Sequence, residues 1–105
     1  MSTYIVISNF TDQGIRNVRE TTNRADIMRE SAKKFGVTVK EIYWTLGAYD
    51  VVALFDAPDE AAITTLALSL GSAGNVRTQV MRGFTQQEMK GVLSRLTQER
   101  IVAHA

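Results

Sequence analysis

The 105-residue chain contains no cysteine, one histidine and one proline. Without cysteine there can be no disulfide, no thiolate metal ligand and no cysteine nucleophile, which agrees with a reducing compartment. The first eight residues lack a basic start, and their apolar run is too short for a signal peptide. No later segment approaches the roughly 20 apolar residues of a membrane span. We therefore expect a cytoplasmic protein with no membrane-embedded part.

The chain also lacks an excess of either charge, because 12 basic and 11 acidic side chains give a formal net charge of +1. Proteins that bind nucleic acid usually carry a basic face. The basic residues are densest between residues 16 and 34, where acidic residues are interleaved with them. That pattern is typical of a solvated helix face, so we expect no nucleic acid partner.

Signatures of metal, cofactor or hydrolase chemistry are absent from the sequence. His104 is the single histidine and lies next to the last residue. A metal site built from two or more histidines is therefore excluded. No Gly-x-Ser-x-Gly elbow occurs. The glycines at 71 and 74 end a predicted helix instead of opening one, which disfavours a phosphate cradle. The sequence thus predicts neither a metal site nor a cofactor.

Hydrophobic periodicity and turn residues predict seven elements within one domain, residues 1–105. The order is strand, helix, strand, strand, helix, strand, helix. The expected strands are Thr3–Ser8, Val37–Leu46, Tyr49–Asp56 and Asn75–Gly83. The expected helices are one long helix from about Thr11 to Phe35, one that enters through Asp56-Ala57-Pro58-Asp59-Glu60, and one that begins with the capping box Thr85-Gln86-Gln87-Glu88. Residues 98–105 are weakly specified and are expected to form a flexible tail or to dock.

This order is the split βαβ arrangement of an α+β, ferredoxin-like βαββαβ fold with an additional C-terminal helix. The sheet is therefore expected to be four-stranded and antiparallel. The last helix is expected to turn inward the apolar side formed by Met89, Val92, Leu93 and Leu96.

Alternation along the predicted hairpin defines two faces of the sheet. A two-residue turn through Gly47-Ala48 places Leu46 opposite Tyr49 and Tyr43 opposite Val52. One face is apolar and suits the helix-covered side, with Trp44 in the core: Ile42, Trp44, Leu46, Tyr49, Val51, Ala53 and Phe55. The other face is mixed: Val39, Glu41, Tyr43, Thr45, Asp50, Val52 and Leu54.

The mixed face carries more apolar surface than a free antiparallel sheet normally shows to water. Its simplest partner is a second copy of the chain, stacked sheet against sheet about a two-fold axis. The alternative is that the last helix folds over this face within one chain. We expect a homodimer or a higher oligomer.

The hairpin also resembles a known family. The residues Gly47-Ala48-Tyr49-Asp50, with Tyr43-Trp44-Thr45-Leu46 before them and Ala57-Pro58-Asp59 after them, are similar to the signature of the GYD domain family. The likeness extends to Gly74-Asn75-Val76-Arg77-Thr78 and so covers most of the chain. It implies a ferredoxin-like domain of the dimeric α/β-barrel type in a small bacterial protein, and it implies the oligomer more firmly than any reaction.

Asp50 is the leading candidate for a site residue, because a carboxylate within an apolar strand needs a partner or a proton. Its structural interpretation is that it accepts hydrogen bonds from turn amides, Thr45 or Tyr43. Its functional interpretation is a general base or ligand anchor. The candidate ligand-binding set comprises Tyr43, Thr45, Tyr49, Asp50 and Arg82, where Arg82 either binds an anion or pairs with an acid across an interface.

Three functions follow as hypotheses. The first is a homo-oligomeric module that binds a small organic ligand, or acts structurally, with a pocket at the sheet face. The second is a cofactor-independent isomerase or monooxygenase that uses Asp50 as base and Tyr43 as oxyanion donor, which rests on fold analogy. The third is a regulatory or scaffold partner of a larger complex, which presents its outer helices to other proteins.

Overall fold

The computed structural model describes residues 1–96, so the predicted tail at 98–105 lies outside the described residues. The strands are β1 (Ser2–Phe10), β2 (Thr38–Trp44), β3 (Val51–Ala57) and β4 (Val76–Gly83). The helices are α1 (Asp12–Arg16), the 3₁₀ turn η1 (Val18–Glu20), α2 (Thr21–Lys34), α3 (Glu60–Ser72) and α4 (Gln86–Leu96).

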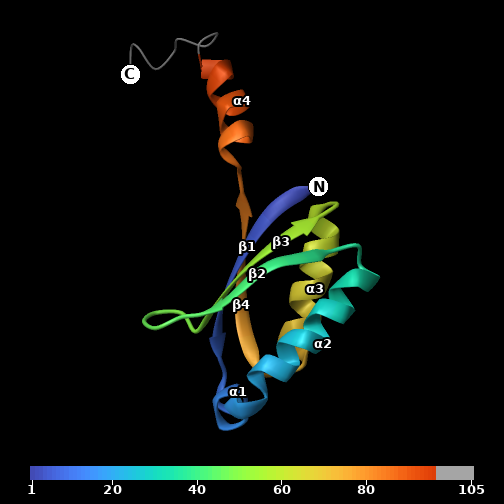
Figure 1. Cartoon of the computed structure of the whole chain (residues 1–105), viewed down its shortest axis with the longest axis vertical. Coiled ribbons are helices and arrows are strands. Elements are labelled where there is room, and N and C mark those ends of the chain that lie inside the picture. The colour runs from blue at the N-terminus through green and yellow to red at the C-terminus, as the bar shows by residue number, and fades with distance from the viewer. Residues whose placement is uncertain (97–105) are drawn as a thin grey trace.

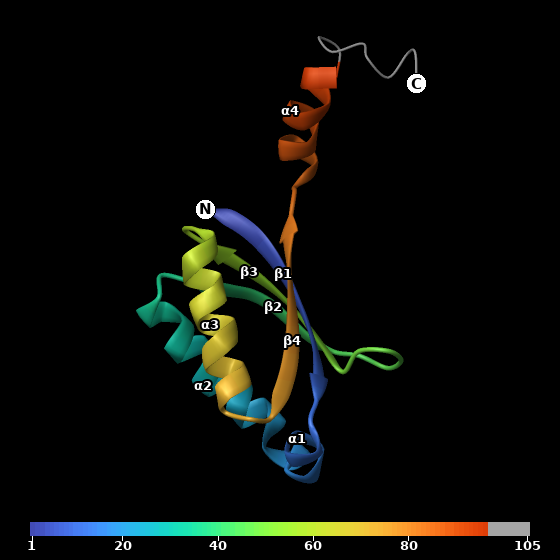
Figure 2. The ribbon, with the colours of Figure 1, turned by 180° about the vertical axis from the view of Figure 1, so that it is seen from behind.

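The four strands form one antiparallel sheet in the order β2-β3-β1-β4. Helices α2 and α3 both pack on one side of it, and no helix of residues 1–96 covers the opposite side (Figures 1 and 2). The predicted α+β, ferredoxin-like fold with an additional C-terminal helix is therefore confirmed.

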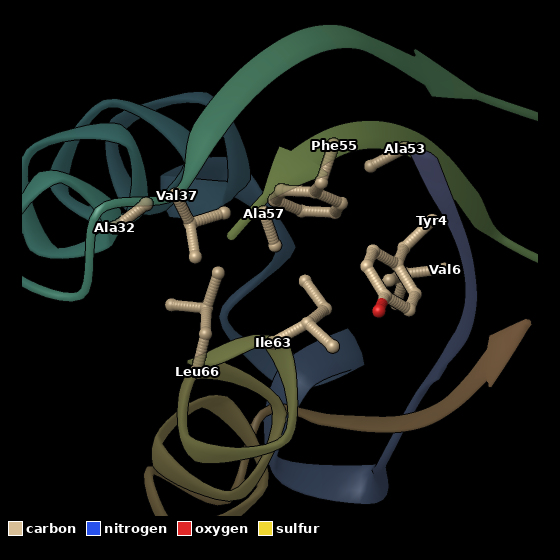
Figure 3. Close-up of a cluster of buried hydrophobic side chains, with 9 residues drawn as sticks. All are labelled: Tyr4, Val6, Ala32, Val37, Ala53, Phe55, Ala57, Ile63 and Leu66. Carbon is tan, nitrogen blue, oxygen red and sulfur yellow. The ribbon is translucent and has the colours of Figure 1, made fainter. Parts of the chain in front are cut away.

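The core lies between the sheet and the two covering helices. Tyr4 and Val6 of β1 and Phe55 of β3 face Ile63 and Leu66 of α3, and all five side chains are at most 4% exposed (Figure 3). Full burial of a large apolar side chain stabilises a fold by roughly 1.5–3 kcal/mol. This layer therefore fixes the sheet against the helices and defines an inner and an outer face of the sheet.

The predicted long helix from Thr11 to Phe35 is wrong, because the chain breaks at Asn17. Thr11 caps α1 as predicted, and its hydroxyl accepts from the amide of Gly14 at 3.1 Å. The backbone of Asn17 then leaves the helical conformation, and the carbonyl of Asn17 accepts from Arg24 at 2.8 Å. On one continuous helix Ile15 and Val18 would share the inner apolar side, whereas in the structure both are exposed.

The entrance to α3 also lies further along the chain than predicted. Asp59 is the cap, and its carboxylate accepts from the amide of Ala62 at 2.8 Å. Asp56 and Ala57 still belong to β3, where they pair with Thr3 and Ser2 of β1. The pairing with β1 thus extends the strand past the predicted boundary.

Helix α4 stands apart from the rest of the molecule, at the end of an extension of β4 (Figure 1). The predicted capping box is present, since the Thr85 amide donates to Glu88 at 2.9 Å and the Glu88 amide donates to the Thr85 hydroxyl at 3.1 Å. The prediction that the apolar side of this helix turns inward is wrong for a single chain. The four side chains on that side are 43–55% exposed: Met89, Val92, Leu93 and Leu96. The helix therefore does not fold back over the sheet.

The uncovered side of the sheet, which we call the outer face, carries an apolar patch. By register, its central residues are Ile5 and Ile7 of β1 with Val52 and Leu54 of β3, all half-buried. Two exposed side chains flank them in the same register rows: Tyr43 and Met81. The prediction that Val52 and Leu54 face outward is confirmed, and Ile5 and Ile7 of β1 join them.

Val39 was predicted on the outer face, and this is wrong. It pairs with Phe55 and packs against the core. The reason is a bulge between Val39 and Glu41, where Lys40 is the extra residue. A bulge shifts alternation by one residue and so reverses the face of everything beyond it.

Candidate functional site

The predicted site lies around the β2–β3 hairpin, whose register was predicted correctly and whose turn was not. Tyr43 pairs with Val52 and Trp44 with Val51, as expected. The strands end there, however, and the six residues 45–50 form a loop that projects from the sheet (Figure 1). Leu46, predicted on the apolar face, is fully exposed at 102%. Tyr49, predicted on the same face, lies in this loop and is exposed.

Asp50 ties this loop to the central strand. Its amide donates to the carbonyl of Ser8 at 2.9 Å, and its carboxylate accepts from the amide of Phe10 at 2.9 Å. The side chain therefore bonds β1 across the sheet, where the sequence suggested the turn amides, Thr45 or Tyr43. Hydrogen bonds to a charged acceptor are stronger than neutral ones, so Asp50 holds the base of the loop.

The hairpin brings together some of the predicted ligand-binding residues. Thr45 donates its hydroxyl to the carbonyl of Tyr49 at 2.6 Å, and its amide donates to the carbonyl of Asp50 at 2.8 Å. Tyr43 projects from the outer face two residues earlier and is 54% exposed. Thr45, Tyr49 and Asp50 thus share one loop, with Tyr43 at its start.

Arg82 lies elsewhere, in the register row of Tyr4 near the opposite end of β1. Its guanidinium lies over the rings of Tyr4 and Phe84, with 4.5 Å to the centre of Phe84. It pairs with the carboxylate of Glu88 at 3.2 Å and donates to the carbonyl of Gly83. The acid lies in the same chain and not across an interface as suggested, and this pair links β4 to α4.

The same contacts lower the pKa of Glu88 below its ordinary value, first through the hydrogen bond from the Thr85 amide and then through the bond from Arg82. A lowered folded-state pKa means that the carboxylate stabilises the helix start above its ordinary pKa and loses that effect as the pH falls through the folded value.

We therefore expect the first turn of α4 to fray in acid, below the ordinary glutamate pKa, before the sheet unfolds. Amide hydrogen exchange at residues 86–89 should accelerate as the pH is lowered below that range, relative to amides of β1. Glu88→Gln should remove this pH dependence. Exchange that tracks the global unfolding of the sheet would contradict the expectation.

A second prediction concerns Asp50. Asp50→Ala removes the acceptor for the Phe10 amide and should lower the free energy of unfolding by about 1–2 kcal/mol. Asp50→Asn keeps one oxygen acceptor and should cost less than half as much. Denaturant titration of both variants measures this. Equal losses would contradict the anchoring role, and an intact fold with lost ligand binding in Asp50→Asn would favour the functional interpretation.

A cavity lies on the side of the sheet opposite to the predicted pocket, between the sheet and helices α2 and α3. Its volume is about 350 Å³. Trp44 lines it instead of filling the core, and its ring nitrogen donates to the Thr21 hydroxyl at 3.0 Å. The sequence analysis missed Ser8 and Thr21 as lining residues. A serine in the inward register between Val6 and Phe10 was the available signal for the first.

Comparison with known proteins decides the family. The model of the GYD domain matches residues 4–93. The chain belongs to the GYD domain family. The match spans the sheet, the covering helices and most of α4, and it includes the hairpin whose residues resemble the signature.

A curated relative of this GYD domain is a protein from Thermus thermophilus named "Glutamine synthetase and cystathionine beta-lyase binding protein". It is 35% identical over 82 residues, which cover 77% of this chain and 86% of the relative. A crystal structure of a protein from the same organism matches with a TM-score of 0.53 and 24% identity, over 81% of this chain and 95% of that one. This likeness supports the fold.

Two further observations bear on the kind of protein. No helix among residues 1–96 is long and apolar enough to cross a membrane. Within the same residues, no group of three or more histidine, cysteine, aspartate or glutamate side chains is placed to hold a metal ion.

Proposed function

We propose that this GYD-domain protein is a non-catalytic binding protein that assembles with itself through the outer face and engages an enzyme of amino-acid metabolism. The observation that carries the proposal is the uncovered apolar patch on the outer face. Four half-buried aliphatic side chains at the centre of a sheet, with no helix of the described residues over them, are unusual for a protein that works alone.

A second copy, related by a two-fold axis, would cover this patch with the same patch of its own. Ile5 would lie near the centre of such an interface, because it is flanked by Leu54 on one side and Met81 on the other. Self-association would then remove from water the surface that a single chain leaves exposed.

Helix α4 supports the same assembly. Its exposed apolar stripe follows Met81 of the outer face closely along the chain, so the stripe and the outer face belong to one continuous segment. An amphipathic helix gains most of its stability by packing its apolar side. We propose that the second copy provides that packing surface.

The enzyme partner is proposed from the relative, whose name states that it binds glutamine synthetase and cystathionine beta-lyase. With the outer face occupied by a second copy, the helix layer remains available to such a partner. Leu68 of α3 is a well-exposed apolar side chain on that layer. Because enzymes of this kind act on cytoplasmic metabolites, the proposal also places the protein in the cytoplasm.

The enzymatic hypothesis gains no support from the site. Asp50 directs a carboxylate oxygen to the Phe10 amide, and Tyr43 is half exposed on an open face. A general base needs a substrate held within hydrogen-bond reach and shielded from water. We therefore prefer binding over catalysis as the function of this chain.

Sedimentation velocity with purified Thermus thermophilus glutamine synthetase tests the partner. We expect the chain to sediment with the enzyme, and Leu68→Glu to weaken the complex while Thr22→Glu, an exposed change on α2, leaves it intact. Independent sedimentation of the two proteins at all concentrations would contradict the proposed partner.

A further inference from the structure

We infer that the cavity on the inner side of the sheet is a binding site for a small, uncharged molecule with an apolar body and one hydroxyl or carbonyl group. This site is separate from the outer face and from the predicted hairpin site. It does not rest on the proposed self-association, because it lies on the helix-covered side of the sheet, opposite the outer face.

The cavity borders the core, because core residues of β1, β3 and α3 also line it. Apolar walls are supplied by Val6 of β1, Leu66 and Leu70 of α3, and Val76 of β4. Short side chains stand where larger ones would close the space, notably Ala25 of α2 and Ala53 of β3. The cavity is open on one side, where the exposed residues Ile27 and Trp44 line it, so its volume of about 350 Å³ is accessible to a ligand.

Ser8 gives the cavity its polar anchor. The residue is 8% exposed and is the one buried polar residue of the core among residues 1–96. Its backbone carbonyl accepts from Asp50, while its hydroxyl makes no hydrogen bond within the described part of the chain. No buried side-chain polar atom in that part lacks a partner, so the hydroxyl is not sealed in the protein, and Ser8 is one of the residues that line the cavity. A buried hydroxyl is stabilised by a hydrogen-bonding partner, which a ligand can provide.

The charged and polar groups at the wall explain why the ligand is uncharged. Arg24 lines the cavity, but its guanidinium donates to the carbonyls of Asn17 at 2.8 Å and Gly14 at 3.5 Å. The Thr21 hydroxyl accepts from Trp44. The guanidinium is thus held by backbone carbonyls. Ser31, Ser69 and Asn75 also line the cavity but are not buried, so among the described residues Ser8 is the buried hydrogen-bonding group at its wall.

The volume sets the size of the ligand. A cavity of roughly 150 Å³ holds benzene, and ligand sites in proteins span roughly 300–1,000 Å³. At about 350 Å³ this cavity suits a two-ring or similarly sized aliphatic body. Borneol, a bicyclic alcohol, and bornane, the same skeleton without the hydroxyl, are therefore matched probes.

Trp44 provides the readout, because it is the single tryptophan of the chain and lines the cavity. We expect borneol to cause a saturable change in Trp44 emission. Ser8→Ala should weaken borneol binding by roughly three- to tenfold, the loss of one hydrogen bond, and should leave bornane binding unchanged. Ala25→Leu fills the cavity and should abolish binding of both probes, and Ala73→Leu serves the same purpose if Ala25→Leu does not fold.

Two results would overturn the inference: no saturable response of the wild-type protein to borneol, or an unchanged response in a folded cavity-filling variant. The monomeric variant Ile5→Glu keeps the cavity and should still bind borneol, so failure of self-association and failure of the cavity site are distinguishable.

Discussion

Ile5→Glu is expected to convert the assembled protein into monomers. The residue lies at the centre of the outer face, between Leu54 and Met81. At a two-fold interface the change places two like charges in an apolar contact, where neither has a partner. We expect the dissociation constant of the dimer to rise at least roughly a hundredfold, which corresponds to about 2.7 kcal/mol.

Sedimentation of the variant and of Thr22→Glu separates this effect from a general effect of charge. Thr22 is exposed on α2, on the other side of the sheet, so its change should leave the dimer intact. Circular dichroism should show that both variants remain folded. A folded Ile5→Glu protein that still assembles like the wild type would remove the outer face from the interface.

Gly14→Ala is expected to be among the most destabilising single changes in the chain. A Cβ at this position would overlap the backbone carbonyl of Asn75, which accepts from the amide of Thr11 at 3.1 Å. Both partners are backbone, so relief requires α1 to move away from the start of β4. We expect a loss of about 3 kcal/mol in the free energy of unfolding, and a melting temperature lower by more than about 10 °C.

Gly91→Ala is the matched control for this substitution. Gly91 is also helical, but a Cβ there meets no atom within 4 Å. Because alanine is the better helix former, the control should leave stability unchanged or raise it by up to about 1 kcal/mol. Thermal unfolding followed by circular dichroism measures both. Equal effects of the two changes would show that the close approach of Gly14 to Asn75 is not a constraint.

The hairpin shows how far the sequence predicts this fold. A turn centred on Gly47-Ala48 predicted which side chains pair across β2 and β3, and Tyr43 opposite Val52 was correct. The end of the pairing was not predictable from the hairpin itself. It depends on the hydrogen bond between Asp50 and β1, a strand forty residues earlier in the chain. With Asp50 bonded to β1, the β2–β3 pairing ends before the turn and Leu46 is exposed.

Two other errors have local causes that composition conceals. The bulge at Lys40 reversed the face of Val39. The β-branched and charged residues around it give no sign in the sequence that the strand contains an extra residue. The break at Asn17 interrupted a helical period that continues across it, because α1 must turn to meet Asn75. Periodicity records which residues are apolar, and tertiary contacts decide where an element bends.

The site was harder to predict than the fold. Tyr43, Thr45, Tyr49 and Asp50 were grouped correctly around one hairpin, whereas Arg82 pairs with Glu88 at the far end of β1. The cavity was missed, because small residues that leave a space look the same in a sequence as small residues that allow close packing. The apolar stripe of α4 was recognised, but a period of 3.6 residues does not specify which molecule covers it.

The central claim is that the outer face is covered by a second copy of the chain, and the mass of the unmodified protein in solution tests it most directly. Sedimentation equilibrium across a wide range of concentrations should give twice the chain mass of 11.6 kDa, or a higher multiple. A single species of 11.6 kDa at the highest concentration would contradict the claim.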